Sequence, residues 1–267
     1  MKKLSIFAVA VAAMAFTACG GNKSANNAEQ EETVKSFEQE QVEASIKIHI
    51  DSLASELGQL KQLPIMQNGE NGIQLTDEEK QVKPDYLLDP ALAENATTLA
   101  EKYRMLSALQ VDKKIASLYD MPTEEYDKAI NKLAADINDP SFKVLDDAAT
   151  IYETSQTLYD AMNENGRINY FWQLVSTALV EQLYVLSQNT EKFMVAFDDD
   201  AASNITFRIV LLTDAVARLA EYDAEIAPVA KAIEPLEVLN AISVDQMKTQ
   251  LAEAKAEIVA ARDALLK

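Results

Sequence analysis

The sequence is poor in the residues on which much enzyme chemistry depends. Its 267 residues include one cysteine, one histidine and six glycines. A single cysteine cannot form a disulfide within the chain or a multi-thiolate metal site, and one histidine cannot supply a paired-histidine site. The six glycines form no glycine-rich phosphate loop. These absences exclude enzymes of the phosphate-loop and dinucleotide-binding folds, which need that loop.

Positive charge is also scarce. The chain has 24 Lys and Arg residues against 43 Asp and Glu residues, which gives a formal net charge of -19. Such a charge repels nucleic-acid phosphates, so we expect no nucleic-acid partner. A protein partner with a basic surface is favoured instead. Apolar residues make up 48% of the chain, which is enough for a substantial core.

The alternation of apolar and polar residues that is typical of strands is not sustained in any segment. Apolar residues instead recur at intervals of three and four, which predicts amphipathic helices. The spacing predicts a helix over 34–63 that Pro64 ends, and a final helix over 244–265 that begins with a capping box of Ser243 and Gln246. We therefore predict an all-α, multi-helix bundle of roughly six to eight amphipathic helices with no sheet.

Local start and stop signals divide the middle of the chain. Asp89 with Pro90, and Asp139 with Pro140, each combine an N-cap with a proline at the first helical position. They predict helices over 90–120 and 140–163, the second closed by Gly166.

Two further helices are predicted over 167–196 and 203–224. Both are apolar on a wide face, so we expect them to form the central pair of the core. The prolines in 225–241 predict only short helical pieces there.

The segment 64–89 interrupts this regular pattern. It contains Gly69 and Gly72 among amide side chains, and only a brief helix that Thr76 and Glu79 cap. A connection of this length is either a functional segment, a mobile one or a simple crossover between helices. The sequence leaves these alternatives open.

The first residues have the order of an export signal. Lys2 and Lys3 precede an apolar run over 4–16, which is shorter than the ~20 residues that a membrane-spanning helix needs. The four residues Phe16, Thr17, Ala18 and Cys19 follow.

This stretch resembles the lipobox of bacterial lipoproteins, with Phe16 in the place where leucine is most common. The resemblance implies that residues 1–18 are a cleaved signal peptide and that Cys19 carries a thioether-linked diacylglycerol, usually with a third acyl chain on its amino group. Two or three acyl chains anchor a protein stably to a membrane. We expect no cofactor besides this lipid, and no metal.

Residues 19–33 contain little to bury and are interpreted as a flexible tether to a helical-bundle domain over 34–267. The acidic run after the cysteine begins only at Glu29. Lipoproteins sent to the cell surface often carry acidic residues directly after the cysteine. We therefore expect a lipid-anchored protein of the outer membrane, on its periplasmic side rather than at the cell surface.

Four aromatic residues, Tyr170, Phe171, Trp172 and Tyr184, gather in one predicted helix. They are interpreted as core, with a ligand pocket between helices as the alternative. His49 lies beside an apolar stripe, which favours a structural role over that of a catalytic base.

The densest carboxylate run is Asp198, Asp199 and Asp200. It is expected to stabilise the start of a helix rather than to bind calcium, because the spacing of a calcium loop is absent.

These observations predict a noncatalytic, lipid-anchored component of the cell envelope that engages another envelope protein. The alternative is a lipoprotein that binds a small apolar or aromatic molecule near Trp172. A hydrolase that uses acidic residues alone is a third hypothesis, and it requires two carboxylates from different helices to meet in a cleft.

Overall fold

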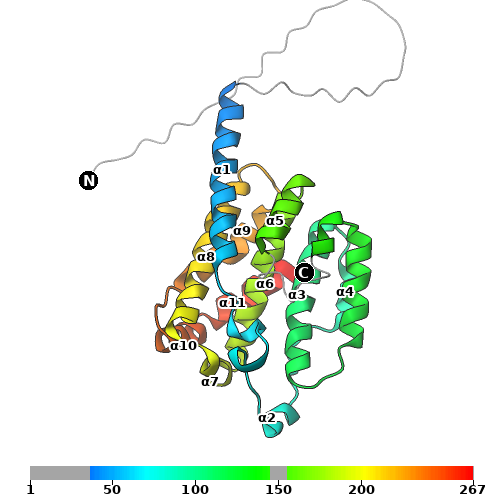
Figure 1. Cartoon of the computed structure of the whole chain (residues 1–267), viewed down its shortest axis with the longest axis vertical. Coiled ribbons are helices and arrows are strands. Elements are labelled where there is room, and N and C mark those ends of the chain that lie inside the picture. Colours follow the sequence, from blue (N-terminus) through cyan, green and yellow to red (C-terminus); the bar gives the residue numbers. More distant parts are fainter. Residues whose placement is uncertain (1–36, 145–154, 267) are drawn as a thin grey trace, which may run out of the picture.

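A computed structural model of the chain describes residues 37–144 and 155–266. Within these two ranges the protein consists of eleven α-helices and six short 3₁₀ helices, and no strand is present (Figure 1). The predicted all-α bundle is therefore confirmed, but six to eight helices is too low a number. The predicted signal peptide over 1–18, the predicted lipid-bearing Cys19 and the predicted tether over 19–33 lie outside the described residues.

The elements follow one another along the chain in this order. They are α1 (Phe37–Gln59), η1 (Pro64–Met66), η2 (Gly69–Asn71), α2 (Asp77–Gln81), η3 (Pro90–Asn95), α3 (Leu99–Leu118), α4 (Glu124–Ile137), η4 (Pro140–Val144), α5 (Ser155–Glu164), α6 (Ile168–Gln188), α7 (Thr190–Phe193), η5 (Met194–Ala196), α8 (Asp199–Leu219), α9 (Ala227–Ile233), η6 (Glu234–Val238), α10 (Val244–Glu253) and α11 (Lys255–Leu266).

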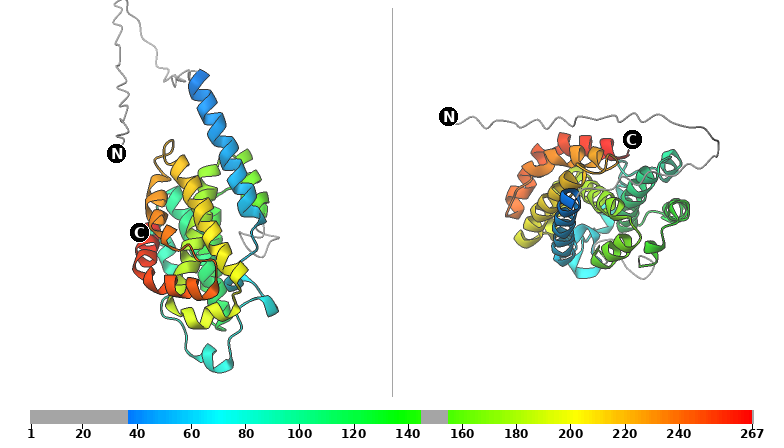
Figure 2. Two further views of the ribbon diagram at one scale, coloured as in Figure 1. Left: turned by 90° about the vertical axis from the view of Figure 1, so that its left-hand side faces the viewer. Right: turned by 90° about the horizontal axis from the view of Figure 1, so that it is seen from above.

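Helix α6 lies in the centre of the bundle and is buried around most of its circumference, including Trp172 and Glu181. It packs more extensively on α3 than on α8, so the expected central pair of α6 and α8 is only partly correct. The reason is that α3 also buries a wide face, which includes Tyr103, Leu109 and Ile115. The view from above in Figure 2 shows the other helices arranged around this centre.

The first turns of α1 project beyond the other helices (Figure 2). Its later turns pack between α5 and α8 and bury Ile50, Leu53 and Leu57, which belong to the predicted apolar stripe. The helix ends at Gln59, and Pro64 opens η1. The predicted end near residue 63 is therefore a few residues late.

The proline signals at 90 and 140 open 3₁₀ helices rather than long α-helices. The oxygen of Asp89 accepts a hydrogen bond from the backbone of Ala91, as an N-cap does, but η3 stops at Asn95. Thr98 and Glu101 then form a capping box that starts α3. The predicted helix over 90–120 is therefore divided, because a second and stronger N-terminal signal lies within it.

Other predicted boundaries shift for similar local reasons. The predicted helix over 167–196 ends at Gln188, since Asn189 leaves the helical conformation, with φ -148° and ψ 69°, and caps the separate helix α7. The predicted final helix is divided at Ala254 into α10 and α11. Ser243 caps α10 as predicted, but Gln246 accepts its hydrogen bond from Ile242 and not from Ser243, so the capping box is only half formed.

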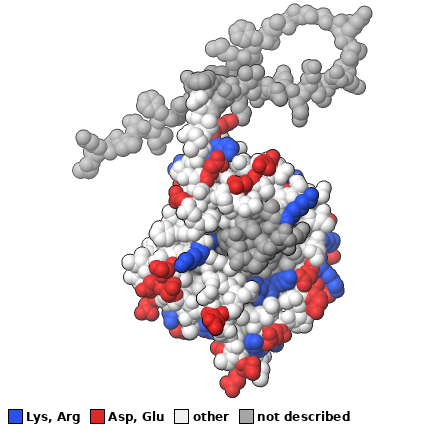
Figure 3. Space-filling model, viewed as in Figure 1, with Lys and Arg blue, Asp and Glu red and all other residues white. Residues whose placement is uncertain are grey.

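Two further features of the described residues bear on function. No helix in the described ranges combines the length and the apolar character needed to cross a membrane. Figure 3 shows acidic side chains in several small groups on one face, with basic side chains beside many of them and uncharged areas between the groups.

Candidate functional site

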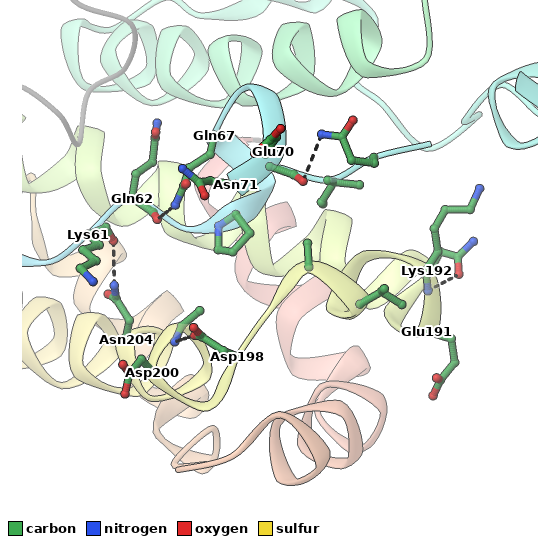
Figure 4. A pocket seen from close by; sticks show the side chains of 18 of the residues that line it. Lys61, Gln62, Gln67, Glu70, Asn71, Glu191, Lys192, Asp198, Asp200 and Asn204 are labelled. Carbon is green, nitrogen blue, oxygen red and sulfur yellow. Dashed lines mark hydrogen bonds between the residues drawn. The ribbon is translucent and has the colours of Figure 1, made fainter. Parts of the chain in front are cut away.

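A polar cleft of about 1120 Å³ lies at the end of the bundle away from the first turns of α1. One wall is the segment 61–79 and the other comes from α7, η5 and the start of α8, as Figure 4 shows. The lining residues are Lys61, Gln62, Pro64, Gln67, Glu70, Asn71, Gly72, Ile73, Gln74, Glu79, Asn189, Glu191, Lys192, Val195, Ala196, Asp198, Asp200, Ala201 and Asn204. Amides and carboxylates predominate in this set.

The first wall is held in place by its own short-range contacts. The three residues of η1 are buried in the core and anchor this wall to it. The side-chain amide of Gln67 donates to the carbonyl of Gln62 at 2.5 Å, and that of Gln74 donates to the carbonyl of Gly69 at 2.5 Å. The segment 64–79 therefore forms an ordered wall of a cleft. This favours the interpretation of this part of the connection 64–89 as a functional segment.

Both glycines of this wall are required by geometry. Gly69 has a φ of +64°, a left-handed conformation that other residues adopt only at a cost. A side chain on Gly72 would place its first carbon 2.4 Å from the carbonyl oxygen of Gln67. The turn therefore closes tightly because no side chain stands at position 72.

The second wall is built from two helix starts. Asn189 accepts a hydrogen bond from the backbone of Lys192 and caps α7, and Asp198 accepts one from Ala201 at 2.8 Å and caps α8. Asp199 accepts a hydrogen bond from the backbone of Val244 at 2.9 Å. The prediction that the Asp198–Asp200 run stabilises a helix start is confirmed.

Two contacts join the walls. The amide of Asn204 donates to the carbonyl of Lys61 at 2.7 Å, and the guanidinium of Arg208 donates to the same oxygen at 2.7 Å. Arg208 also donates to the side-chain oxygen of Asn204 at 3.0 Å and is completely buried. The position of segment 61–79 relative to α8 is therefore fixed by a buried network.

The cleft carries a surplus of negative charge. Five carboxylates line it, those of Glu70, Glu79, Glu191, Asp198 and Asp200, against the two ammonium groups of Lys61 and Lys192.

Several of these charges already have partners. Lys192 lies 3.9 Å from Glu79 and 5.4 Å from the ring centre of Tyr119. The hydrogen bond from the backbone of Thr76 is the main reason why the pKa of Glu79 is below its usual value. Glu191 pairs with Lys248 at 3.3 Å. Glu70 and Asp200 form no hydrogen bond or ion pair with any described residue, so their charges are available to a ligand.

The four aromatic residues that the sequence analysis considered as a possible ligand pocket do not line one common pocket. Phe171 and Trp172 are fully buried, with ring centres 5.2 Å apart in an edge-to-face arrangement, and they are core residues. Tyr170 stacks on Tyr103 at 4.7 Å, and Tyr184 lies against Arg262 elsewhere in the bundle. None of the four predicted residues lines the polar cleft.

His49 links two helices. Its Nε2 lies 2.7 Å from Asp214 of α8, which also accepts a hydrogen bond from Arg218 at 2.7 Å. Burial raises the pKa of Asp214, but these hydrogen bonds outweigh it and leave the pKa below its usual value. His49 does not line the cleft, so the contact is consistent with the predicted structural role.

The described ranges contain no group of three or more His, Cys, Asp or Glu side chains placed to hold a metal ion.

Comparison with protein-family models, with curated proteins and with solved structures finds no match. The function therefore has to be inferred from the chemistry of the cleft itself. Sequence reasoning missed most of its residues, among them Lys61, Gln67, Lys192 and Asn204. The available signal was the long connection 64–89, but its proximity to the Asp198–Asp200 run exists only in three dimensions.

Proposed function

We propose that this chain is a lipid-anchored, noncatalytic binding protein of the cell envelope, and that its polar cleft receives basic side chains of a partner protein. The observation that supports this proposal most strongly is the surplus of carboxylates in the cleft, beside an exposed apolar strip on α8.

The electrostatics favour a cationic partner. Glu70 and Asp200 line the cleft on opposite walls (Figure 4) and are not neutralised by other described residues. The whole chain also carries a net charge of -19, which attracts a basic surface from a distance and raises the rate of association.

The surface next to the cleft is apolar, which supports a protein partner rather than a free cation. Phe207 and Val210 of α8 are 59% and 54% exposed. Phe207 follows Asp200 by seven residues, so both lie on one face of α8, about 10 Å apart. Ile242 is 71% exposed, and its carbonyl contacts Ser203 on the same face. We name Phe207, Val210 and Ile242 the α8 patch.

An exposed aromatic residue next to charged groups is a common anchor in protein interfaces. A partner segment with apolar residues on one side and lysine or arginine beside them matches the cleft and the α8 patch together. The noncatalytic part of the proposal is supported by the use that the cleft makes of its carboxylates. Those from different elements do line the cleft, as an acidic hydrolase requires, but Asp198 caps α8 and Glu79 belongs to the capping box of α2.

The lipid anchor is proposed from the lipobox at Phe16–Cys19 and has a test of its own. Mass spectrometry of the native protein is expected to find an N-terminal, acylated Cys19. A Cys19→Ala variant is expected to leave the membrane fraction. Native protein with an intact Met1 or a free thiol would contradict this part of the proposal.

Binding to the cleft is tested with a synthetic amphipathic peptide of lysine and leucine, followed by fluorescence anisotropy. The Glu70→Gln/Asp200→Asn variant is expected to bind the peptide about tenfold more weakly, because each exposed ion pair contributes roughly 0.2 to 1 kcal/mol. The matched control is Asp136→Asn/Glu253→Gln, which removes the same charge from exposed positions outside the cleft. Equal weakening in both variants would contradict a specific role of the cleft.

A further inference from the structure

A second cavity, of about 460 Å³, lies between η3, α3 and the last turns of α11. It shares no lining residue with the polar cleft. Its lining residues are Leu88, Leu92, Asn95, Ala96, Glu101, Met105, Arg262, Asp263, Leu265 and Leu266. Mostly apolar walls, a few polar groups and this volume are typical of sites for small molecules.

Arg262 is the polar group best placed to orient a ligand. Its Nε donates to both carboxylate oxygens of Glu181, at 2.9 and 2.8 Å, and its Nη2 lies 2.8 Å from one of them. The guanidinium also lies 3.9 Å from the ring centre of Tyr184. The side chain is therefore held rigidly along one edge of the guanidinium.

The other amino group of Arg262, Nη1, forms no hydrogen bond with the part of the chain that the structure describes. Arg262 lines the cavity, and its Nε and Nη2 face Glu181. Nη2 is buried against Glu181 in an ion-pair contact without a hydrogen bond. Nη1 makes neither kind of contact with a described residue, so it is the nitrogen left to meet an acceptor atom in the cavity. A rigid donor of this kind costs little conformational entropy when a ligand binds.

The charges around the cavity disfavour an anion. Glu181 neutralises Arg262, and Asp112 is completely buried 3.8 Å from the same guanidinium. Burial and the negative charge of Glu181 raise the pKa of Asp112 well above its usual value. In either protonation state its carboxyl group offers an anion no attraction. The remaining carboxylates at the cavity, those of Glu101 and Asp263, repel a negatively charged head group.

A free cation also lacks a dedicated partner, because Glu101 is already occupied. Its carboxylate accepts hydrogen bonds from the backbone of Thr97 and Thr98 at 2.8 and 2.9 Å. These bonds lower the pKa of Glu101 to about 2. The pattern of one available N–H donor between apolar walls matches a neutral oxygen.

We infer that this cavity binds an uncharged aliphatic molecule whose hydroxyl or carbonyl oxygen accepts a hydrogen bond from Arg262 Nη1. The apolar body of the ligand packs against Leu92, Met105 and Leu265. This site is independent of the polar cleft and of the proposed protein partner.

Isothermal titration with 1-octanol, octanoate and octylammonium tests the inference, because these probes share one chain and differ in the charge of the head group. Octanol is expected to bind at least tenfold more tightly than octanoate or octylammonium. Absence of octanol binding, or tighter binding of either charged probe, would overturn the inference.

Two variants locate the binding. Ala96→Leu, at the C-cap of η3, fills the cavity and is expected to weaken octanol binding at least tenfold. Ala91→Leu, within η3 but outside the cavity, is expected to change octanol binding less than twofold. Arg262→Lys keeps the charge beside Glu181 but removes the guanidinium donor, and is expected to weaken octanol binding several-fold. If Arg262→Lys unfolds, as circular dichroism would show, the comparison of Ala96→Leu with Ala91→Leu decides. Unchanged affinity in Ala96→Leu refutes the site.

Discussion

The side-chain amide of Asn204 and the backbone carbonyl of Lys61 are joined by a hydrogen bond of 2.7 Å that connects the two walls of the polar cleft. The bond links the first third of the chain to its last third, across 143 positions. The buried guanidinium of Arg208 reinforces this bond, because it donates hydrogen bonds both to the side-chain oxygen of Asn204 and to the carbonyl of Lys61. The shape of the cleft and the stability of the bundle therefore depend on the same few groups.

Replacing Asn204 is expected to weaken both properties. Asn204→Ala removes the bond to Lys61 and leaves Arg208 without one of its buried acceptors. Urea denaturation is expected to show a loss of about 1–3 kcal/mol in the free energy of unfolding, the usual cost of an unsatisfied buried polar group. Asn71→Ala, at an exposed position of the same cleft, is expected to cost less than about 0.5 kcal/mol. An equal loss of unfolding free energy in the two variants would show that the buried network does not hold the two walls of the cleft together.

The two glycines of segment 61–79 provide a matched pair. Gly69→Ala meets no atom within 4 Å and is expected to cost about 1 kcal/mol for its left-handed backbone alone. Gly72→Ala collides with the carbonyl of Gln67 and has to displace the wall of the cleft. Hydrogen exchange is expected to reveal faster exchange in segment 61–79 of Gly72→Ala than of Gly69→Ala. Faster exchange in Gly69→Ala than in Gly72→Ala would contradict the tight approach of Gly72 to the carbonyl of Gln67.

The buried group of Asp112, Glu181 and Arg262 predicts a dependence of stability on pH. The raised pKa of Asp112 means that the folded state binds a proton that the unfolded state releases above about pH 4. Asp112 therefore stabilises the fold fully at low pH, and this contribution declines as the pH rises toward the folded pKa. Glu79, Glu101 and Asp214 have lowered pKa values, so their contributions are lost only as the pH falls below about 4.5.

The test is urea denaturation between pH 5 and 8 on the wild type and Asp112→Asn. The variant is expected to show a smaller decline in stability with rising pH, because asparagine does not titrate, while Glu181, whose pKa burial also raises, keeps its own contribution. Glu181→Gln is expected to cost about 3–5 kcal/mol, since it leaves Arg262 without its buried counter-charge. An Asp112→Asn protein with an unchanged pH slope would show that Asp112 is ionised in the fold.

The environment of Trp172 predicts a simple spectroscopic result. The side chain is fully buried, beside Phe171 and Tyr159. Its emission is expected to be blue-shifted and almost insensitive to iodide in the native state, and fully quenchable in urea. Native quenching as strong as that of free tryptophan would place Trp172 at an open pocket instead of in the core.

Local sequence signals predicted the class of the fold well, because helix caps and apolar spacing act over a few residues. Asp198, Ser243 and Gly166 stand at the helix boundaries that their residue types indicate. The same signals also explain the errors. Thr98 and Asn189 carry cap signals inside segments that look continuous from apolar spacing alone, so the predicted helices over 90–120 and 167–196 were too long.

The cleft was much less predictable than the fold. Gln67, Lys192 and Asn204 are ordinary polar residues in the sequence, and only the packing of α8 against the end of α1 brings them together. The second cavity was hidden for the same reason, since Ala96 and Arg262 are far apart in the chain. Nothing in the local pattern marks Asp112 and Glu181 as buried, because charged residues are usually solvated.

The proposed partner surface is tested most directly by photocrosslinking in native envelopes. A photoreactive amino acid in place of Phe207, in the α8 patch, is expected to give one discrete crosslinked protein, which disappears when Glu70→Gln/Asp200→Asn is added. The same probe at the exposed position of Ala135 is expected to give no such product. Loss of the product only with the cleft variant supports the account, whereas identical crosslinking from both positions, or none from position 207, contradicts it.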